Sequence, residues 1–286
     1  MAGSTQSLPS RLERLVRDWL SQALLPFVLI GLLQAIGGRL AVAEPPEVTT
    51  IINKMKDSIE PARPSRSRMV ITVHSEGETV EWTGHQARKQ LADGKHILTV
   101  ILEPESVRGV ALLVWEPKDQ PEVQWIYLPA VRRVRKLIPV SAFESFFNTD
   151  FTFYDLGFIA LNDRGFALLG EDTEGSRRVY KVQEVPRNPY YYSRVVTWVA
   201  EDSFLPLHRD YYDGAGALWK IERFENVTTI DGVPTPLRIV MEDKQAGTSS
   251  ELRFSSVRYD VAVPDELFDP KNLPKAAAHP SWRAGG

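Results

Sequence analysis

Two neighbouring stretches of this chain carry the residue types that could do chemistry. The first, "IYLPAVRRVRK" at 126–136, gathers the cations Arg132, Arg133, Arg135 and Lys136. The second, "FFNTDFTFYDLGF" at 146–158, sets Asp150 and Asp155 among phenylalanines. Cations bind anionic groups, and two carboxylates can work as general acid and base. A nucleic-acid grip, a catalytic pocket and the rim of a lipid-carrying barrel would all have this composition.

The catalytic interpretation finds no specific support elsewhere in the chain. No H-E-x-x-H motif or other metal-ligand spacing includes the five histidines, at positions 74, 85, 96, 208 and 279. No G-x-S-x-G turn presents a nucleophile. Two aspartates more often cap turns or pair with arginine than act as acid and base. We therefore expect no enzyme activity, no catalytic residue, no metal and no cofactor.

Charge and cysteine content narrow the classes further. The formal net charge of −3 is spread along the chain, whereas nucleic-acid binding needs a basic field over one face. We expect no nucleic-acid partner. The absence of cysteine removes disulfides, thiol catalysis and a lipid-modified cysteine, so the chain is not itself a lipoprotein.

The N-terminal residues 1–43 have the layout of a signal peptide. Three arginines precede an apolar run at 19–36, and Ala41 and Ala43 satisfy the A-x-A cleavage pattern. The alternative is an uncleaved membrane anchor, although the run is near the lower length limit for a span. We expect export with cleavage, and hence a location in a bacterial periplasm.

The chain after residue 43 is predicted to be mainly β. Apolar residues at helical spacing predict one helix over 44–60, before Pro61. About eleven segments with two-residue alternation follow, separated by turn sequences such as "DGAGA" and "DGVPTP". This pattern predicts a single antiparallel sheet curved into a large open barrel or half-barrel. The domain would span 44–273, with a flexible tail at 274–286.

A curved sheet of this size should enclose more space than its own side chains fill. The N-terminal helix, the segment 139–165 or an acyl chain could occupy that space. The basic cluster has two interpretations. It is either a solvated edge strand or a docking surface for an anionic headgroup or acidic partner.

The two stretches also resemble a known family. The pattern "W-x-YLP-x-x-RRVR" followed by "SFF-x-x-DF-x-x-x-DL" is similar to the motif of the LolA-like outer-membrane lipoprotein-sorting family. It runs from Trp125 and Tyr127 through Arg135, then from Ser145 to Leu156. The family usually has Gly-Ser before the first aspartate and an acidic residue before the second, where this chain has Asn148-Thr149 and Tyr154.

The resemblance implies an incomplete barrel closed by the N-terminal helix and short helices. This half-barrel would be a carrier that binds the acyl chains of a lipid or lipoprotein in an apolar concavity. Such a carrier, a monomer, would pass its cargo from an inner-membrane lipid exporter to the outer membrane. A non-enzymatic envelope sensor and a scaffold subunit of a lipid-export complex are the alternatives.

Specific residues follow from this hypothesis. The concavity would be lined by Ile71, Val73, Trp82, Leu112 and Trp198. Headgroups or a partner would dock on Arg132, Arg133 and Arg135. A lid hinge, held by Arg–Asp pairing, would consist of Trp125, Tyr127, Asp150 and Asp155.

Overall fold

The computed structural model describes residues 46–75, 77–117, 120–138, 144–146, 148–157, 164–187 and 191–282. The predicted signal peptide at 1–43 and the last four residues of the predicted tail lie outside these ranges. Pro46–Gly286 group into one unit by their contacts. Within the described ranges, no helix has both the length and the apolar character needed to cross a bilayer.

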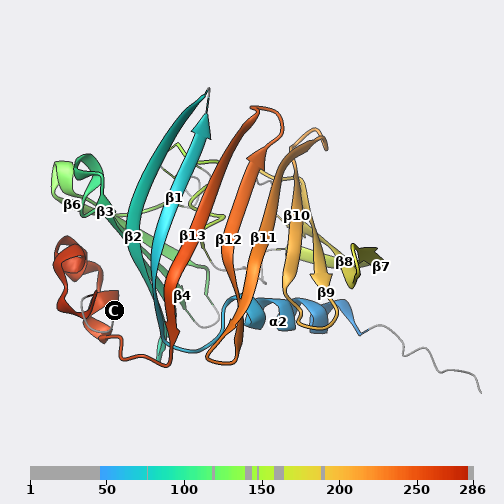
Figure 1. Cartoon of the computed structure of the whole chain (residues 1–286), viewed down its shortest axis with the longest axis horizontal. Coiled ribbons are helices and arrows are strands. Elements are labelled where there is room, and N and C mark those ends of the chain that lie inside the picture. Colours follow the sequence, from blue (N-terminus) through green and yellow to red (C-terminus); the bar gives the residue numbers. More distant parts are fainter. Residues whose placement is uncertain are drawn as a thin grey trace, which may run out of the picture. The chain divides into compact units, whose positions relative to one another are not determined.

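A single curved antiparallel sheet, not closed into a barrel, dominates this unit (Figure 1). The described residues give it thirteen strands in the order β6-β5-β4-β3-β2-β1-β13-β12-β11-β10-β9-β8-β7. The strands are β1 (Ser65–Ser75), β2 (Glu78–Leu91), β3 (Gly94–Glu103), β4 (Ala111–Pro117), β5 (Val123–Leu128), β6 (Arg133–Lys136), β7 (Arg164–Glu174), β8 (Arg177–Pro186), β9 (Arg194–Ala200), β10 (Pro206–Tyr212), β11 (Leu218–Ile230), β12 (Val233–Asp243) and β13 (Thr248–Tyr259).

The predicted sheet is confirmed, with thirteen strands instead of about eleven. The two uncounted strands, β6 and β7, are the two edges of the sheet. An edge strand pairs on one side only and tolerates charge and glycine, so its apolar alternation is weak. The basic cluster forms β6, and β7 carries Gly165 and Gly170.

The alternation of side chains divides the sheet into two faces. We call the face that carries Ile71, Leu112 and Val195 the inner face; its core includes side chains from the segment 146–153. The outer face carries Leu98 and Leu113, which pack against C-terminal residues. Both faces are therefore covered at β3 and β4, which explains why these strands carry apolar residues on both faces.

The helix α2 (Val48–Ile59) covers one end of the inner face. Ile51, Ile52 and Met55 lie on one side of the helix and are buried against Val182 of β8 and Val199 of β9. The spacing of these apolar residues is what makes the helix amphipathic and directs this side toward the sheet. The predicted helix is therefore present, over slightly fewer residues.

The C-terminal segment is ordered against the outer face, so the prediction of a flexible tail from residue 274 is wrong for the described part. Three 3₁₀ helices cover this face: η4 (Asp265–Phe268), η5 (Pro270–Ala278) and η6 (Pro280–Trp282). Leu273 and Ala276 are buried, and Trp282 stacks on His85 with ring centroids 4.9 Å apart. The Pro- and Ala-rich composition is compatible with 3₁₀ turns, and the outer face offers the apolar surface that fixes them.

Candidate ligand-binding site

A loop at 144–157 fills much of the inner face. Its side chains Phe146, Phe151 and Phe153 are buried in the same core cluster as Ile71 and Leu112. Phe146 meets Phe153 edge to face at 5.4 Å between ring centroids. The phenylalanine-rich stretch thus serves as apolar filling for the curved sheet. We call the described residues 144–146 and 148–157 the phenylalanine loop.

Asp150 ties the phenylalanine loop to β13. Its carboxylate accepts hydrogen bonds from Thr248 Oγ1 at 2.5 Å and Ser250 Oγ at 2.6 Å. Its backbone N–H donates to Ser250 Oγ at 2.8 Å, and Lys220 Nζ donates to its carbonyl oxygen at 2.6 Å. These four bonds all involve Asp150, so they hold the loop to the sheet at one defined point.

Asp155 organises the far end of the loop. Its carboxylate accepts from the Thr152 backbone N–H at 2.8 Å and from the Tyr192 hydroxyl at 3.1 Å. Burial raises the pKa of Asp155, and the nearby Lys220 only partly offsets this effect. Burial, together with the Asp155 charge, holds the pKa of Tyr192 well above its usual value. Ionising the Asp155 carboxylate in the folded protein therefore costs free energy.

The Arg–Asp pairing expected from the sequence is wrong. Asp150 and Asp155 bond to hydroxyl and amide donors of the inner face. Arg132, Arg133 and Arg135 are exposed and form no ion pair with any described residue. In the register of the sheet, Arg133 and Arg135 pair with Leu128 and Ile126 of β5. Because Ile126 belongs to the inner-face core, these two arginines project on the inner-face side of the edge strand.

Trp125 and Tyr127 do not form a hinge with the two aspartates. Both pack in the outer-face cluster, while the loop lies on the inner face. Trp125 stacks on Trp115 with ring centroids 6.0 Å apart, and Lys136 Nζ lies 5.9 Å from the centroid of the Trp125 ring. Side chains alternate along β5, so Trp125 and Tyr127 lie on the outer face while Ile126, between them, lies on the inner face. The spacing of the motif alone does not show which face each residue takes.

Four of the five residues predicted to line the concavity lie on the inner face. Ile71 and Leu112 are buried, Trp82 packs against the same cluster, and Val73 is half-buried two residues along β1 from Ile71. The prediction that Trp198 lines the concavity is wrong. It stacks on His208 at 4.0 Å on the outer side, because its neighbours on β9 at 197 and 199 are the ones that turn inward.

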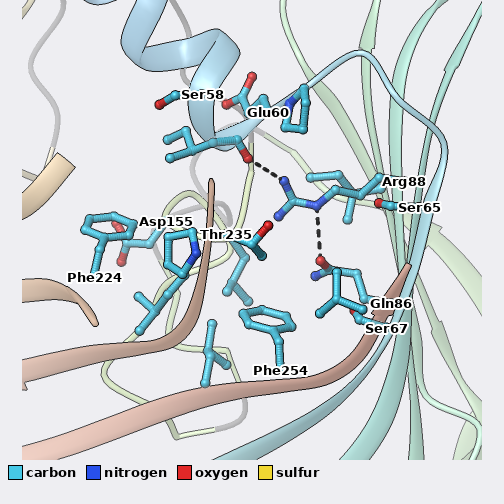
Figure 2. Close-up of a pocket in the computed structure, with 18 of the residues that line it drawn as sticks. Ser58, Glu60, Ser65, Ser67, Gln86, Arg88, Asp155, Phe224, Thr235 and Phe254 are labelled. Carbon is cyan, nitrogen blue, oxygen red and sulfur yellow. Dashed lines mark hydrogen bonds between the residues drawn. The ribbon is translucent and has the colours of Figure 1, made fainter. Parts of the chain in front are cut away.

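The space left on the inner face is a cavity of about 150 Å³. Figure 2 shows Ser58 and Glu60 from the end of α2 on one side, Gln86 and Arg88 of β2 on another, and Asp155 with Phe224 opposite. Arg88 Nη1 donates to the carbonyl oxygen of Ile59 at 2.9 Å, and its Nε donates to Gln86 Oε1 at 3.1 Å. Helix, sheet and loop therefore all meet at this cavity.

Part of the cavity lining is apolar. Its apolar lining comes from the phenylalanine loop, β3 and the strands β11 to β13: Ile97, Phe151, Leu156, Phe224, Ile239, Leu252 and Phe254. The polar part includes a buried group on β10 and β11. Arg209 Nη1 donates to Glu222 Oε2 at 3.2 Å, and the Tyr211 hydroxyl donates to the same oxygen at 2.7 Å.

Sequence reasoning missed Arg88, Arg209 and Glu222. Each stands in a strand with no motif around it, at a position that turns inward. The only sequence signal is that "LWKIERFE" places Lys220 and Glu222 in phase with Phe224. Which of the two phases faces the core depends on the partner strands, so that signal is ambiguous without the fold.

Solved structures with the same architecture place the fold in a class. A DUF1329 family protein from Desulfovibrio piger is 27% identical with a TM-score of 0.73, over 80% of this chain and 100% of its own. A putative outer membrane lipoprotein-sorting protein domain from Vibrio parahaemolyticus is 24% identical with a TM-score of 0.74, over 79% and 97%. A LolA superfamily protein from Nitrosomonas europaea is 22% identical with a TM-score of 0.64, over 79% and 98%.

The chain accordingly has a LolA-like fold, as the sequence motif indicated. A family model described as "Uncharacterized protein" matches residues 93–275, and the chain belongs to that family. No curated protein sequence matches the chain.

The buried Asp155 predicts a specific pH dependence. Its folded-state pKa is raised above the ordinary 3.8, so between these two values the folded protein holds more protons than the unfolded chain. Its contribution to stability is therefore fully present below pH 3.8 and is lost as pH rises through the folded pKa. Asp155→Asn should be more stable than the wild type at about pH 7, with the difference shrinking as pH falls.

Urea unfolding of both proteins across this pH range measures the difference. Asp57→Asn, at an exposed position of α2, is the control. A wild type that is more stable than Asp155→Asn at neutral pH would show that the carboxylate is not strained by its burial.

Proposed function

We propose that this protein is a periplasmic carrier whose inner face binds the apolar chains of a lipid or lipoprotein when the phenylalanine loop withdraws. The observation that carries the proposal is the loop itself. It covers the inner face with three buried phenylalanines, and polar bonds from Asp150 fasten it. A removable apolar filling is what a carrier of water-insoluble chains needs.

Energetics favour such an exchange. Burying a phenylalanine contributes about 1.5–3 kcal/mol, so the loop's three contribute about 5–9 kcal/mol together. A chain of about twelve methylenes recovers about 10 kcal/mol at about 0.8 kcal/mol each. The two are of similar size, so neither occupant of the inner face excludes the other. A balance of this kind allows a carrier to take up and release its cargo.

The size of the cavity fits a closed state. A cavity of about 150 Å³ accommodates a group of about the size of benzene, which is far smaller than an acyl chain. An acyl chain could enter only if the loop moved away from Ile71, Trp82 and Leu112. In this proposal these residues and Val73 are the chain-binding surface, and the loop is the lid.

Export and docking complete the proposed role. Residues 1–43 would direct the protein to the periplasm, leaving 44–286 as the mature chain. The exposed Arg132, Arg133 and Arg135 on the edge of the sheet would attract an anionic membrane surface at the inner-face side. An inner-membrane lipid exporter would supply the cargo. The proposed activity is binding and transfer, with no catalytic step.

The first test removes the fastening of the lid. Asp150→Ala loses the bonds to Thr248 and Ser250, so opening the loop costs less and an apolar ligand should bind about 3–10-fold more tightly. Fluorescence titration with Nile red, a neutral apolar dye, measures the affinity. Asp202→Ala, which removes an exposed aspartate paired with Arg177, should leave it unchanged.

Two results would contradict the proposal. No Nile red binding to either protein would favour a scaffold or sensor with a permanently filled interior. Binding that is equal in the wild type and Asp150→Ala would show that the dye does not enter under the loop.

The second test concerns the edge arginines. Replacing Arg132, Arg133 and Arg135 together by serine should weaken binding to phosphatidylglycerol-containing vesicles by tenfold or more, because each surface cation contributes about 1 kcal/mol to attraction by anionic lipid. Vesicle co-sedimentation at low and high salt measures this. Replacing Lys54, Arg178 and Lys244, three exposed cations on other elements, is the charge-matched control. An equal loss of vesicle binding in both triple variants would contradict a docking role for the three arginines, because it would show that only the total charge matters.

A further inference from the structure

The guanidinium of Arg209 has two buried N–H donors without an acceptor among the described residues. Its Nε and Nη2 are shielded from solvent and have no hydrogen-bond partner, while Nη1 donates to Glu222 at 3.2 Å. The guanidinium also lies over the Phe224 ring, 5.1 Å from its centroid. A buried N–H without an acceptor is costly. The side chain borders the cavity on the inner face, and in the open state proposed above an acceptor would reach the two shielded donors once the phenylalanine loop moves.

The two free donors are a matched pair. Nε–H and one Nη2–H lie in the guanidinium plane along the same edge, with the spacing of the two oxygens of one carboxylate. Glu222 sits on the other nitrogen and does not block this side. The geometry is suited to a planar monoanion that binds through two oxygens.

The carboxylates around the cavity already have donors of their own. Glu222 accepts from Tyr211 at 2.7 Å, Glu60 pairs with Lys56 at 2.9 Å, and Asp155 accepts from Thr152 and Tyr192. Arg88 is a second buried cation at the same cavity, held by Ile59 and Gln86. A dianionic phosphate would face three protein carboxylates in this space, whereas one carboxylate adds a single charge beside two arginines.

Apolar side chains form part of the lining, beside polar groups such as Ser67 and Gln86. Phe151, Ile239 and Phe254 border the same cavity as Arg209. A ligand with a carboxylate at Arg209 would therefore lead its chain toward the inner face that the loop covers. The cavity of about 150 Å³ has room for the head and first carbons, and the remainder needs the loop to move.

We infer that the inner-face cavity is the head-group site for a carboxylate-ended aliphatic chain, bound side-on by Arg209 Nε and Nη2 with Arg88 as second cation. This inference rests on the proposed function and specifies its ligand class. It predicts selectivity for fatty acids over neutral lipids of the same chain length.

Competition against Nile red tests the head group separately from the chain. Laurate and dodecanol carry chains of equal length, and laurate should displace the dye from the wild type at roughly tenfold lower concentration, since a hydrogen bond to a charged group is stronger than one to a neutral group. Arg209→Lys keeps the charge but loses the fork and should remove most of this preference. Arg209→Met combined with Glu222→Gln removes both charges, so that no carboxylate is left unpaired, and should abolish it.

Arg223→Met is the matched control. Arg223 is the next strand's arginine on the outer face, paired with Glu242, and its loss should leave the preference intact. Thermal melting by circular dichroism establishes that each variant is folded. Nile red binding with equal displacement by laurate and dodecanol would overturn the carboxylate site and leave the carrier proposal standing. A preference that survives both Arg209 variants would have the same consequence. A wild type that binds neither dye nor chain would overturn both.

Discussion

The burial of the phenylalanine loop against the inner face is the interaction on which this structure depends. A single sheet cannot shield an apolar concave surface by itself, and here the chain supplies its own cover through Phe146, Phe151 and Phe153. The cover differs from an ordinary core because it belongs to a short loop, which polar bonds at Asp150, Phe153 and Asp155 attach to the rest of the fold. The outer face, by contrast, is closed by consecutive 3₁₀ helices at the C-terminus.

The polar groups beneath the loop follow from the same arrangement. Arg88, Arg209 and Glu222 are carried inward by strands that also bring apolar residues such as Trp82 and Phe224 to the inner face. Buried charges of this kind are costly and seldom improve stability over apolar replacements. In the proposed function, their position at a cavity between helix, sheet and loop serves the recognition of a ligand.

Much of the fold could be predicted from sequence, because alternation and turn residues are local signals. The eleven strands between the two edge strands, and the helix with Ile51, Ile52 and Met55, could be predicted in this way. The edge strands were harder, since pairing on one side leaves weak alternation. The site was harder still: "RVVTWVA" is apolar on both faces, so nothing local showed that Trp198 points outward. The donors that Asp150 meets on β13 are about one hundred residues away, and only the sheet register brings them together.

The central claim is that an apolar ligand replaces the phenylalanine loop on the inner face. Amide hydrogen exchange measures this directly, because the Asp150 N–H bonds to Ser250 of β13 only while the loop is in place. Saturation with laurate should accelerate exchange at this amide while the β12–β13 ladder stays protected. Unchanged or slower exchange at the Asp150 amide in the saturated protein would contradict the account.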